Sequence, residues 1–381
     1  MEELQKFREK IDIIDDKLIS LFCERMKLSG EIADFKRDNG LRILNPTRER
    51  EILCQIIEEA GDDFEHYAKI LFYTIFDLSR SYQTKIFLPD SPLIKKIENA
   101  LKTTPKQFPG RAVVACQGVE GAYSQQACDR FFSLPSIMYF RNFEGVFNAV
   151  EKGLCKYGIL PIENSTAGSV NQVYDMMKHY EFHIVRSLRL RVDHHLLAKP
   201  GVEIADVREI FSHNQAVNQC EKYLKTLKDV KVTICENTAL AAKMVAESDR
   251  RDIAAISSID CAGLYDLCIL EDDIQNSNNN YTRFICISKD LEIYPGAART
   301  SLMLTIPHKP GSLYNTIAKI AAAGLNLTKL ESRPIPGHDF EFMFYFDVEG
   351  SIYDTQTTKL ISVLDNDLDQ FTYLGSYNEM L

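Results

Sequence analysis

The N-terminal segment carries an apolar repeat that restricts its fold more than any other feature of the sequence. Apolar side chains recur at alternating steps of three and four residues: Leu4, Phe7, Ile11, Ile14, Leu18, Leu21, Leu28, Ile32 and Phe35. Such steps place side chains along one seam of an α-helix. The sequence therefore predicts one long helix with a heptad seam.

Two further helices are predicted after it. Asn45 and Pro46 are typical of an N-cap followed by proline at the first helical position, so a short helix is expected to run to about Ala60. A third helix is expected over 64–87. We therefore interpret residues 1–88 as an all-α domain of three helices.

The length of the chain and the positions of its prolines indicate further domains and a linker. A chain of 381 residues predicts two or three domains. Four of the thirteen prolines fall between 89 and 110, which favours a linker with a short helix over 93–101.

Beyond residue 111 the pattern becomes mixed. Apolar runs at 112–116, 157–160, 210–211, 230–234 and 253–256 alternate with helical stretches, which predicts an α/β domain over 111–290 with a mostly parallel sheet. From residue 299 to 378 the order is strand (301–306), helix (312–323), strand (326–332), strand (340–348), helix (354–364) and strand (370–377). That βαββαβ order predicts an α+β, ferredoxin-like domain.

Composition excludes several function classes. The formal net charge is −10, which disfavours binding to nucleic acid or to anionic membranes. No apolar run approaches the length of a membrane-spanning helix, and no secretory signal precedes the first helix. The ten cysteines form no Cys-x-x-Cys pair and the eight histidines offer no third ligand, so we expect reduced thiols, no metal, no cofactor and a cytoplasmic protein.

One charged residue interrupts the heptad seam. Arg25 falls between Leu18 and Ile32, and a guanidinium there requires a partner. By itself it is as compatible with a structural role, as a buried ion pair or in a seam that opens to water, as it is with ligand binding. Lys36 returns to the same face about 16 Å further along, so the two cations could close over an anion. Arg8 lies about 42 Å from Lys36, so a shared small ligand would need Arg8 from a second, antiparallel copy. The spacing argues for a dimer.

Polar residues on the three helices complete a candidate site, and its seven members are Arg8, Arg25, Lys36, Arg48, Glu49, Ser79 and Gln83. The cations and neutral polar groups suit a small dicarboxylate with a hydroxyl, and no nucleophile is paired with a base. Residues 1–87 resemble the all-helical chorismate mutases in these motifs. The resemblance implies an intertwined dimer in which Arg8 of the partner, Arg25 and Arg48 hold two carboxylates.

The same resemblance implies how catalysis would work. Lys36 and Gln83 would hydrogen-bond the ether oxygen as its bond to carbon breaks, while Glu49 and Ser79 position the substrate. The rearrangement of chorismate to prephenate is unimolecular and pericyclic, so it needs no proton transfer. Holding the compact conformer and preorganised electrostatics would accelerate it.

In the α/β region, polar clusters repeatedly follow apolar strands. They lie at 118–124, 161–166, 212–215, 236–238 and 257–258. Most such residues only cap helices, but five clusters at the carboxyl ends of strands suggest a ligand crevice. With the stretch 280–284, they make residues 111–290 resemble prephenate dehydratase, most specifically in Pro161-Ile162-Glu163-Asn164 and Thr282-Arg283-Phe284.

This second resemblance implies two α/β lobes with a cleft between them, as in periplasmic solute-binding proteins. Thr282 would donate a hydrogen bond to the hydroxyl that leaves prephenate together with carbon dioxide. The cleft would be lined by Ser124, Glu163, Asn164, Ser165, Thr166 and Gln215. Arg283 would face a carboxylate, although Arg283 and Ser124 are also compatible with a surface pair and a helix cap.

The C-terminal segment resembles an ACT regulatory domain. The supporting motifs are Pro310-Gly311-Ser312-Leu313-Tyr314 and Glu331-Ser332-Arg333-Pro334. Such domains pair side by side and bind an amino acid between them, which here implies L-phenylalanine as effector. The implied contacts are Gly311, Ser312, Leu313, Asn326, Leu327 and Glu331.

Together these resemblances predict a bifunctional chorismate mutase/prephenate dehydratase of phenylalanine biosynthesis, inhibited by L-phenylalanine and at least dimeric. Its ligands would be chorismate, prephenate and L-phenylalanine. One alternative is a dehydratase that acts mainly on arogenate, which carries an amino group in place of the keto group. Another is a solute-binding sensor that holds a ligand without converting it. An intact cationic set on the helices argues against the sensor.

Overall fold

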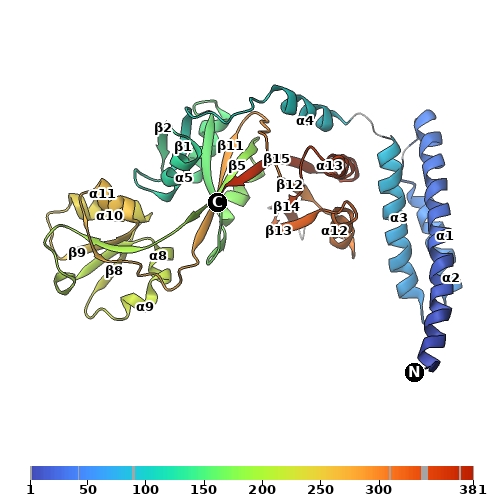
Figure 1. The fold of residues 1–381 in the computed structure, drawn as a ribbon, viewed down its shortest axis with the longest axis horizontal. Coiled ribbons are helices and arrows are strands. Elements are labelled where there is room, and N and C mark those ends of the chain that lie inside the picture. The colour runs from blue at the N-terminus through green and yellow to red at the C-terminus, as the bar shows by residue number, and fades with distance from the viewer. Residues whose placement is uncertain are drawn as a thin grey trace.

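The computed structural model describes residues 2–41, 43–87, 91–308, 310–335, 342–368 and 370–380. They form three parts in a row (Figure 1). A helical unit made from the N-terminal residues stands at one end, two α/β lobes occupy the other end, and the C-terminal domain lies between them. The last domain in the sequence is therefore placed against both of the others.

The helical unit consists of α1 (Glu2–Asp38), α2 (Pro46–Ala60) and α3 (Glu65–Phe87), as the periodicity predicts. The side chain of Asn45 accepts a hydrogen bond from the backbone N–H of Arg48 at 3.1 Å, so the predicted N-cap is present. The long helix α1 packs against α3, which also contacts α2. Within one chain the seam of α1 is not covered, because its nine apolar side chains remain 47% to 63% exposed.

Helix α4 (Pro92–Thr103) follows and packs against the C-terminal domain. Its side chains Ile97 and Ala100 belong to the core that fills that domain. Burial of Ile97 contributes roughly 2 kcal/mol to this packing. The predicted short helix is therefore part of the core of the C-terminal domain as well as part of the linker.

The first α/β lobe contains five main strands and three helices. Its elements are β1 (Val113–Gln117), α5 (Tyr123–Phe131), β2 (Ser136–Phe140), α6 (Phe143–Glu151), β3 (Tyr157–Asn164), β4 (Gly168–Ser169), α7 (Asn171–Met177), β5 (His183–Arg191) and β11 (Tyr281–Ser288). The second lobe contains β6 (His195–Ala198), β7 (Glu209–Ser212), α8 (Asn214–Gln219), α9 (Glu221–Leu224), β8 (Lys231–Ile234), α10 (Thr238–Glu247), β9 (Ile253–Ser257), α11 (Ile259–Leu264) and β10 (Cys268–Glu271), with a short 3-10 helix at Ile204–Asp206.

Both lobes have mixed sheets, which corrects the expectation of mostly parallel pairing. In the first lobe β1 pairs in parallel with β2 and β3, but β11 is antiparallel to β3 and β5. In the second lobe β7 is parallel to β8 and β9, while β6 is antiparallel to β9 and β10. The antiparallel strands arise because the chain crosses between lobes twice, after β5 and before β11.

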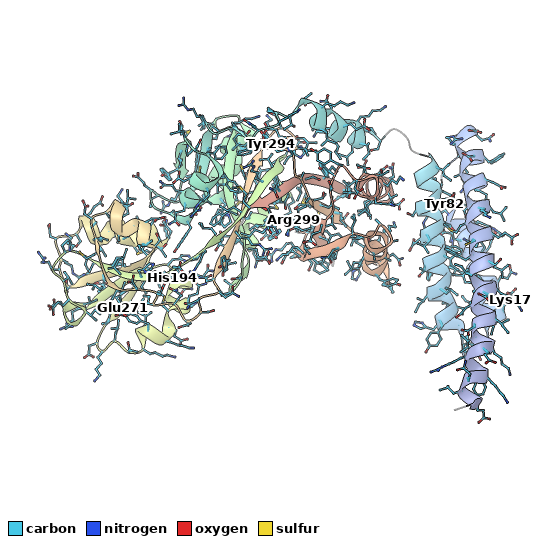
Figure 2. The ribbon with its side chains drawn as sticks, in the orientation of Figure 1. Lys17, Tyr82, His194, Glu271, Tyr294 and Arg299 are labelled. Atoms are coloured by element: carbon cyan, nitrogen blue, oxygen red, sulfur yellow. The ribbon has the colours of Figure 1, made fainter. Side chains whose placement is uncertain are left out.

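The C-terminal domain has the predicted βαββαβ order. Its elements are β12 (Arg299–Thr305), α12 (Ser312–Ala322), β13 (Asn326–Pro334), β14 (Phe342–Glu349), α13 (Thr355–Asp367) and β15 (Phe371–Met380). Helices α12 and α13 face α3 of the helical unit, where Tyr82 and Lys319 line the contact. Tyr82 of α3 (Figure 2) also lies close to α1, because a Cβ atom at Gly30 would be 3.1 Å from its ring.

Strand β15 joins the C-terminal domain to the first lobe. It pairs with β12 and then, near its end, in parallel with β5, so one continuous sheet runs from β13 to β2. One hydrophobic core includes Leu160 and Ile285 of the lobe together with Met303 and Tyr345 of the C-terminal domain. Arg299 lies at this junction (Figure 2) and forms an ion pair with Glu379 at 3.3 Å.

Gly375 makes the junction possible. Its backbone has φ +144°, and a Cβ atom there would lie 2.3 Å from the carbonyl oxygen of Ile184 on β5. Only glycine can let the two strands approach this closely.

Candidate active sites

The helical unit brings polar side chains from two of its helices together. Arg25 of α1 donates a hydrogen bond to the hydroxyl of Ser79 on α3 at 2.5 Å, and the Ser79 hydroxyl also lies 3.7 Å from Sδ of Met26. Lys36 donates to the backbone carbonyl of Ile43 at 2.6 Å and to Oε1 of Gln83 at 3.3 Å. Because Oε1 of Gln83 is an acceptor, its amide N–H groups remain donors for a ligand.

Glu49 is the negative charge of this site. Burial lowers the pKa of Lys36 and of Arg25, and in each case the attraction of Glu49 opposes that shift. Glu49 itself forms an ion pair with Arg80, which also binds Asp77. The sequence analysis missed Arg80. Only its position one residue after Ser79 on the same helix could have indicated it.

The two remaining cations of the predicted set do not join this cluster within one chain. Arg48 pairs with Glu51 at 3.2 Å on the exposed face of α2. Arg8 is exposed on α1, 17 residues and so about 25 Å from Arg25 along the helix. The structure therefore groups five of the seven predicted residues: Arg25, Lys36, Glu49, Ser79 and Gln83.

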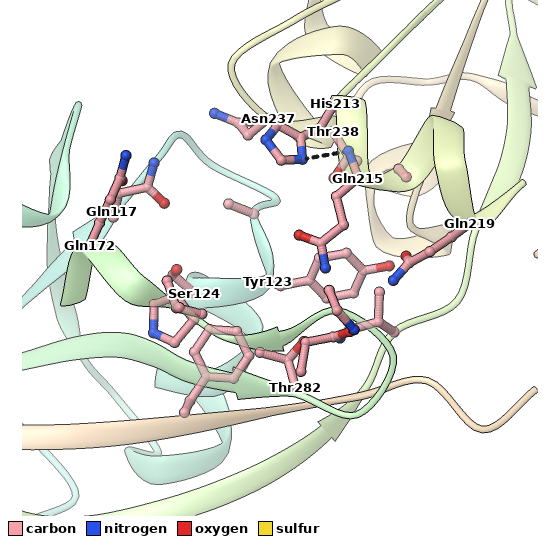
Figure 3. Close-up of a pocket in the computed structure, with 18 of the residues that line it drawn as sticks. Gln117, Tyr123, Ser124, Gln172, His213, Gln215, Gln219, Asn237, Thr238 and Thr282 are labelled. Carbon is pink, nitrogen blue, oxygen red and sulfur yellow. Dashed lines mark hydrogen bonds between the residues drawn. The ribbon is translucent and has the colours of Figure 1, made fainter. Parts of the chain in front are cut away.

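A second site lies between the two α/β lobes, where a cavity of about 450 Å³ opens at the carboxyl ends of several strands. Its lining includes the start of α5, the end of β3 and the starts of α8 and α10. Of the predicted residues it contains Ser124, Asn164, Gln215 and Thr282 (Figure 3). No lysine or arginine is among its described lining residues, and Glu236 is the one carboxylate among them, so a bound anion would have to be held by backbone N–H groups and neutral donors.

Asn164 and Thr282 form the centre of this cleft. They are directly opposite each other on β3 and β11, and Nδ2 of Asn164 donates to Oγ1 of Thr282 at 2.9 Å. The orientation of the amide is fixed, because Oδ1 accepts from the backbone N–H groups of Thr166 and Ala167 while Nδ2 also donates to Asn280. Since Oγ1 of Thr282 accepts from Asn164, its own proton is available to a ligand.

Gln219 links the lobes behind this pair. Its Nε2 donates to Oγ1 of Thr166 at 2.7 Å, and its Oε1 accepts from Nδ2 of Asn280 at 3.1 Å. Oε1 also lies 2.8 Å from Nε2 of His194, which must therefore carry the proton. Burial lowers the pKa of His194, so the ring is neutral. Sequence reasoning missed both residues: Gln219 ends the short helix α8, and His194 lies in the crossing between β5 and β6, outside the predicted clusters.

Other predicted dehydratase residues lie outside the cleft. Ser165 donates to the carbonyl of Asn279, and Thr166 donates to Oδ1 of Asn164, so both shape the loop behind the cavity. Glu163 and Arg283 point the opposite way, toward the C-terminal domain. The expectation that Arg283 faces a substrate carboxylate is therefore not met in this structure.

The C-terminal domain has a smaller apolar hollow at the start of α12. It is lined by Ile306, Pro307, His308, Pro310, Ser312, Leu313, Phe342 and Phe344. Of the predicted effector contacts it contains Ser312 and Leu313, and Gly311 precedes them as the N-cap with φ +83°. Asn326 instead donates to Glu349, and Glu331 accepts from Ser169 of β4.

Two absences hold for the described part of the chain. Its His, Cys, Asp and Glu side chains form no group of three that could coordinate a metal ion. None of its helices combines the length and the apolar character that crossing a membrane requires.

Comparison with known proteins assigns two domains of the chain to families. The family model of chorismate mutase type II matches residues 7–84, and that of prephenate dehydratase matches residues 114–292. The bifunctional chorismate mutase/prephenate dehydratase of Aquifex aeolicus is 32% identical over 388 residues, which cover 100% of this chain and 99% of that protein.

Two further relatives cover 78% and 70% of the chain. Arogenate dehydratase/prephenate dehydratase 2 of Arabidopsis thaliana is 36% identical and spans 78% of this chain and 81% of its own length. The crystal structure of a prephenate dehydratase from Arthrobacter aurescens in complex with L-Phe has a TM-score of 0.64 and 27% identity, covering 70% of this chain and 89% of that one.

The fold and the two sites thus define an enzyme with a helical mutase domain and a two-lobed dehydratase domain. The chain belongs to the family of bifunctional chorismate mutases/prephenate dehydratases. The mutase domain rearranges chorismate to prephenate, and the dehydratase domain dehydrates and decarboxylates prephenate.

Proposed function

We propose that Thr282 is the hydrogen-bond donor to the departing hydroxyl of prephenate, and that Asn164 aims it. The observation that supports this is the 2.9 Å hydrogen bond in which Asn164 donates to Thr282, since it directs the threonine proton away from the strand and toward the cleft. A neutral hydroxyl is a weak acid, but one preorganised donor at a site of developing charge accelerates a reaction by about 10²- to 10³-fold.

The carboxylates of prephenate are held by backbone N–H groups in this proposal. Helix α5 begins at Tyr123 and has no side-chain cap. The N–H of Gln125 donates to the carbonyl of Ala122, which leaves the N–H groups of Tyr123 and Ser124 to bind an anion. Helix α10 begins at Thr238 on the opposite lobe. Two helix N-termini facing one cavity suit a ligand with two carboxylates.

Thr282→Ala, Thr282→Ser and Thr282→Val test the role of the hydroxyl. We expect Thr282→Ser to retain dehydratase activity, and Ala and the isosteric Val to lose it about 10²-fold or more in kcat. Chorismate added to wild type should give phenylpyruvate, and with Thr282→Val it should stop at prephenate, as followed by NMR. Full dehydratase activity of Thr282→Val would contradict the proposed role of the hydroxyl. Chorismate left unchanged by the wild type would contradict the mutase activity.

For the mutase site we propose a dimer that contributes Arg8. The support is the exposed seam of α1 and the absence of Arg8 from the cluster of its own chain. An antiparallel partner on this seam would bring its Arg8 close to Arg25 and Lys36. Arg25, Arg48 and the partner's Arg8 would then bind the two carboxylates of chorismate. Gln83 and Lys36 would then hydrogen-bond the ether oxygen, with Glu49 and Ser79 positioning the substrate.

The C-terminal domain is proposed to be an ACT domain that binds L-phenylalanine and inhibits the enzyme. Its βαββαβ order and the hollow lined by Ser312, Leu313 and Phe344 support this, because an apolar hollow beside a helix N-terminus suits an amino acid with an aromatic side chain. A Cβ atom at Gly311 would meet open space, so the backbone there is accessible to a ligand. We also place the enzyme in the cytoplasm, which suits ten free cysteines.

A further inference from the structure

The two strands that carry the dehydratase centre present charges on their other face. In the register of β3 and β11, Asn164 is opposite Thr282 and Glu163 is opposite Arg283. Successive side chains of a strand point to opposite faces of a sheet. Asn164 and Thr282 therefore face the cleft, and their immediate neighbours face the C-terminal domain.

Arg283 is held entirely by the C-terminal domain. Its side chain is 6% exposed and pairs with Asp347 of β14 at 2.5 Å and with Glu379 of β15 at 3.0 Å. It also donates to the hydroxyl of Tyr377 at 2.7 Å. Asp347 is fixed in turn by the hydroxyl of Ser301. A buried guanidinium that loses such partners is strongly penalised.

Glu163 is bound in the same way from the other edge of that domain. It accepts a hydrogen bond from Lys329 of β13 at 2.8 Å. Lys329 also donates to the hydroxyl of Ser169 at 2.8 Å, and Ser169 donates to Glu331. Ser169 is one of the residues that line the cleft.

We propose that Arg283 and Glu163 are positioning residues through which the C-terminal domain sets the placement of Thr282 and Asn164. Any shift of β14 or β15 must either carry Arg283 along or leave its buried charge unpaired. A shift of β13 acts on Glu163, whose side chain is 35% exposed, through its ion pair with Lys329. Arg283 and Glu163 are each one peptide, about 3.8 Å, from a residue of the dehydratase centre. This proposal rests on the role given above to Thr282.

Asp347→Asn is the main test, made in the full chain with prephenate as substrate. It removes the charge that faces Arg283 and touches nothing in the cleft. We expect kcat to fall 10-fold or more while KM changes less than 2-fold, because the reacting geometry is altered but the binding groups are not. We also expect inhibition by L-phenylalanine to weaken at least 5-fold, although calorimetry still detects L-phenylalanine binding.

Three controls separate positioning from general damage. Glu349→Gln makes the same change two residues further along β14, on a side chain that contacts Arg299 and Asn326, and should leave kcat and inhibition unchanged. Tyr377→Phe removes only one hydroxyl and should lower kcat 2- to 5-fold in a folded protein. Mutase activity and thermal unfolding of each variant report whether the chain is folded.

The outcomes are distinct. The proposal is overturned if Asp347→Asn and Tyr377→Phe keep wild-type kcat and inhibition, if they lower kcat with inhibition unchanged, or if Glu349→Gln has the same effect. An active Thr282→Val variant would contradict the role of the threonine. The coupling between Asp347 and inhibition by L-phenylalanine would still be measured separately.

Discussion

Asn164 donates a hydrogen bond to Thr282 across the pair of strands β3 and β11, and this contact fixes the direction of the threonine hydroxyl. The amide is itself held by the backbone of Thr166 and Ala167 and by Asn280. The geometry of the proposed dehydratase centre thus depends on a side chain whose every polar atom has a partner.

Asn164→Ala is expected to reduce dehydratase kcat about 10- to 100-fold, because the Thr282 hydroxyl loses its fixed direction while its donor is retained. Asn164→Asp should be at least as damaging, since a carboxylate would accept the threonine proton. Both are measured by phenylpyruvate formation from prephenate. Mutase activity on chorismate serves as the internal control, and an unchanged kcat in both variants would contradict the role of Asn164.

The mutase rate should depend on the charge of Lys36. Burial lowers the pKa of Lys36 below its ordinary 10.5, so the protonated form is lost as pH rises through that lowered pKa. We expect kcat to fall on this alkaline limb, and Lys36→Ala to cost about 10²-fold or more at neutral pH. Lys27 is an exposed lysine on the same helix, and Lys27→Ala should change neither kcat at neutral pH nor its fall at alkaline pH. Persistence of the alkaline limb in Lys36→Arg would assign it to another group.

A charge on the seam of α1 should separate the proposed dimer. Ile14→Glu places a carboxylate among apolar side chains, so we expect sedimentation equilibrium to show a smaller assembly than the wild type and mutase activity to fall with the loss of the partner's arginine. Asp16→Lys changes charge off the seam and should leave both properties intact. An assembly of wild-type size in Ile14→Glu, with full mutase activity, would show that the seam is not the interface.

Lowering the pH should reduce the free energy of unfolding, because His183 of β5 is buried as a neutral side chain. Burial, with repulsion from Lys96, lowers the pKa of His183 to about 4 from its ordinary 6.5. Below pH 6.5 the His183 side chain is protonated in the unfolded chain but stays neutral in the folded chain. Its contribution to the free energy of unfolding is therefore fully present above pH 6.5 and is lost as the pH falls toward 4. At pH 5 the loss is about 2 kcal/mol.

Urea unfolding at pH 7.5 and pH 5 measures this loss. His183→Gln should show a smaller difference between the two pH values than the wild type. His66→Gln, which replaces an exposed histidine of α3, should behave as the wild type does. Equal pH dependence in His183→Gln and the wild type would rule His183 out as the cause.

Gly375→Ala should disrupt the junction between β15 and β5. The added Cβ would lie 2.3 Å from the carbonyl oxygen of Ile184, so a strand must move or unpair. We expect the thermal transition of the dehydratase and C-terminal domains to fall, with a cost of more than about 2 kcal/mol. Gly263→Ala, where a Cβ meets open space, is the matched control. An unshifted transition in Gly375→Ala would show that the contact is not rigid.

Local patterns predicted much of this architecture from sequence. The heptad seam, the Asn45 cap and the alternation of strands and helices gave the elements close to their observed bounds, because each depends on residues near in sequence. The mixed pairing of β11 was not predictable in this way, since it depends on where the chain returns from the second lobe. Motifs likewise placed Asn164 and Thr282 in one cleft.

Side-chain direction was the harder part. Arg283 belongs to the same motif as Thr282, yet it points to the opposite face, because strand geometry alternates and the C-terminal domain supplies Asp347. Gln219 sits at the end of a short helix, and its importance arises only when α8 approaches Asn280 and Thr166. Arg80 is found only when α2 brings Glu49 against α3.

The shared sheet has a consequence for how such enzymes can be recombined. Strand β15 belongs to the C-terminal domain through β12 and to the first lobe through β5. A truncation that removed the C-terminal domain would leave β5 as an open edge, prone to self-association, and would expose Arg283 without its partners Asp347 and Glu379. A chimera with a regulatory domain from another enzyme would therefore need to retain Tyr377 and Glu379 on its last strand, so the boundary for exchange lies within β15 and not between the two domains.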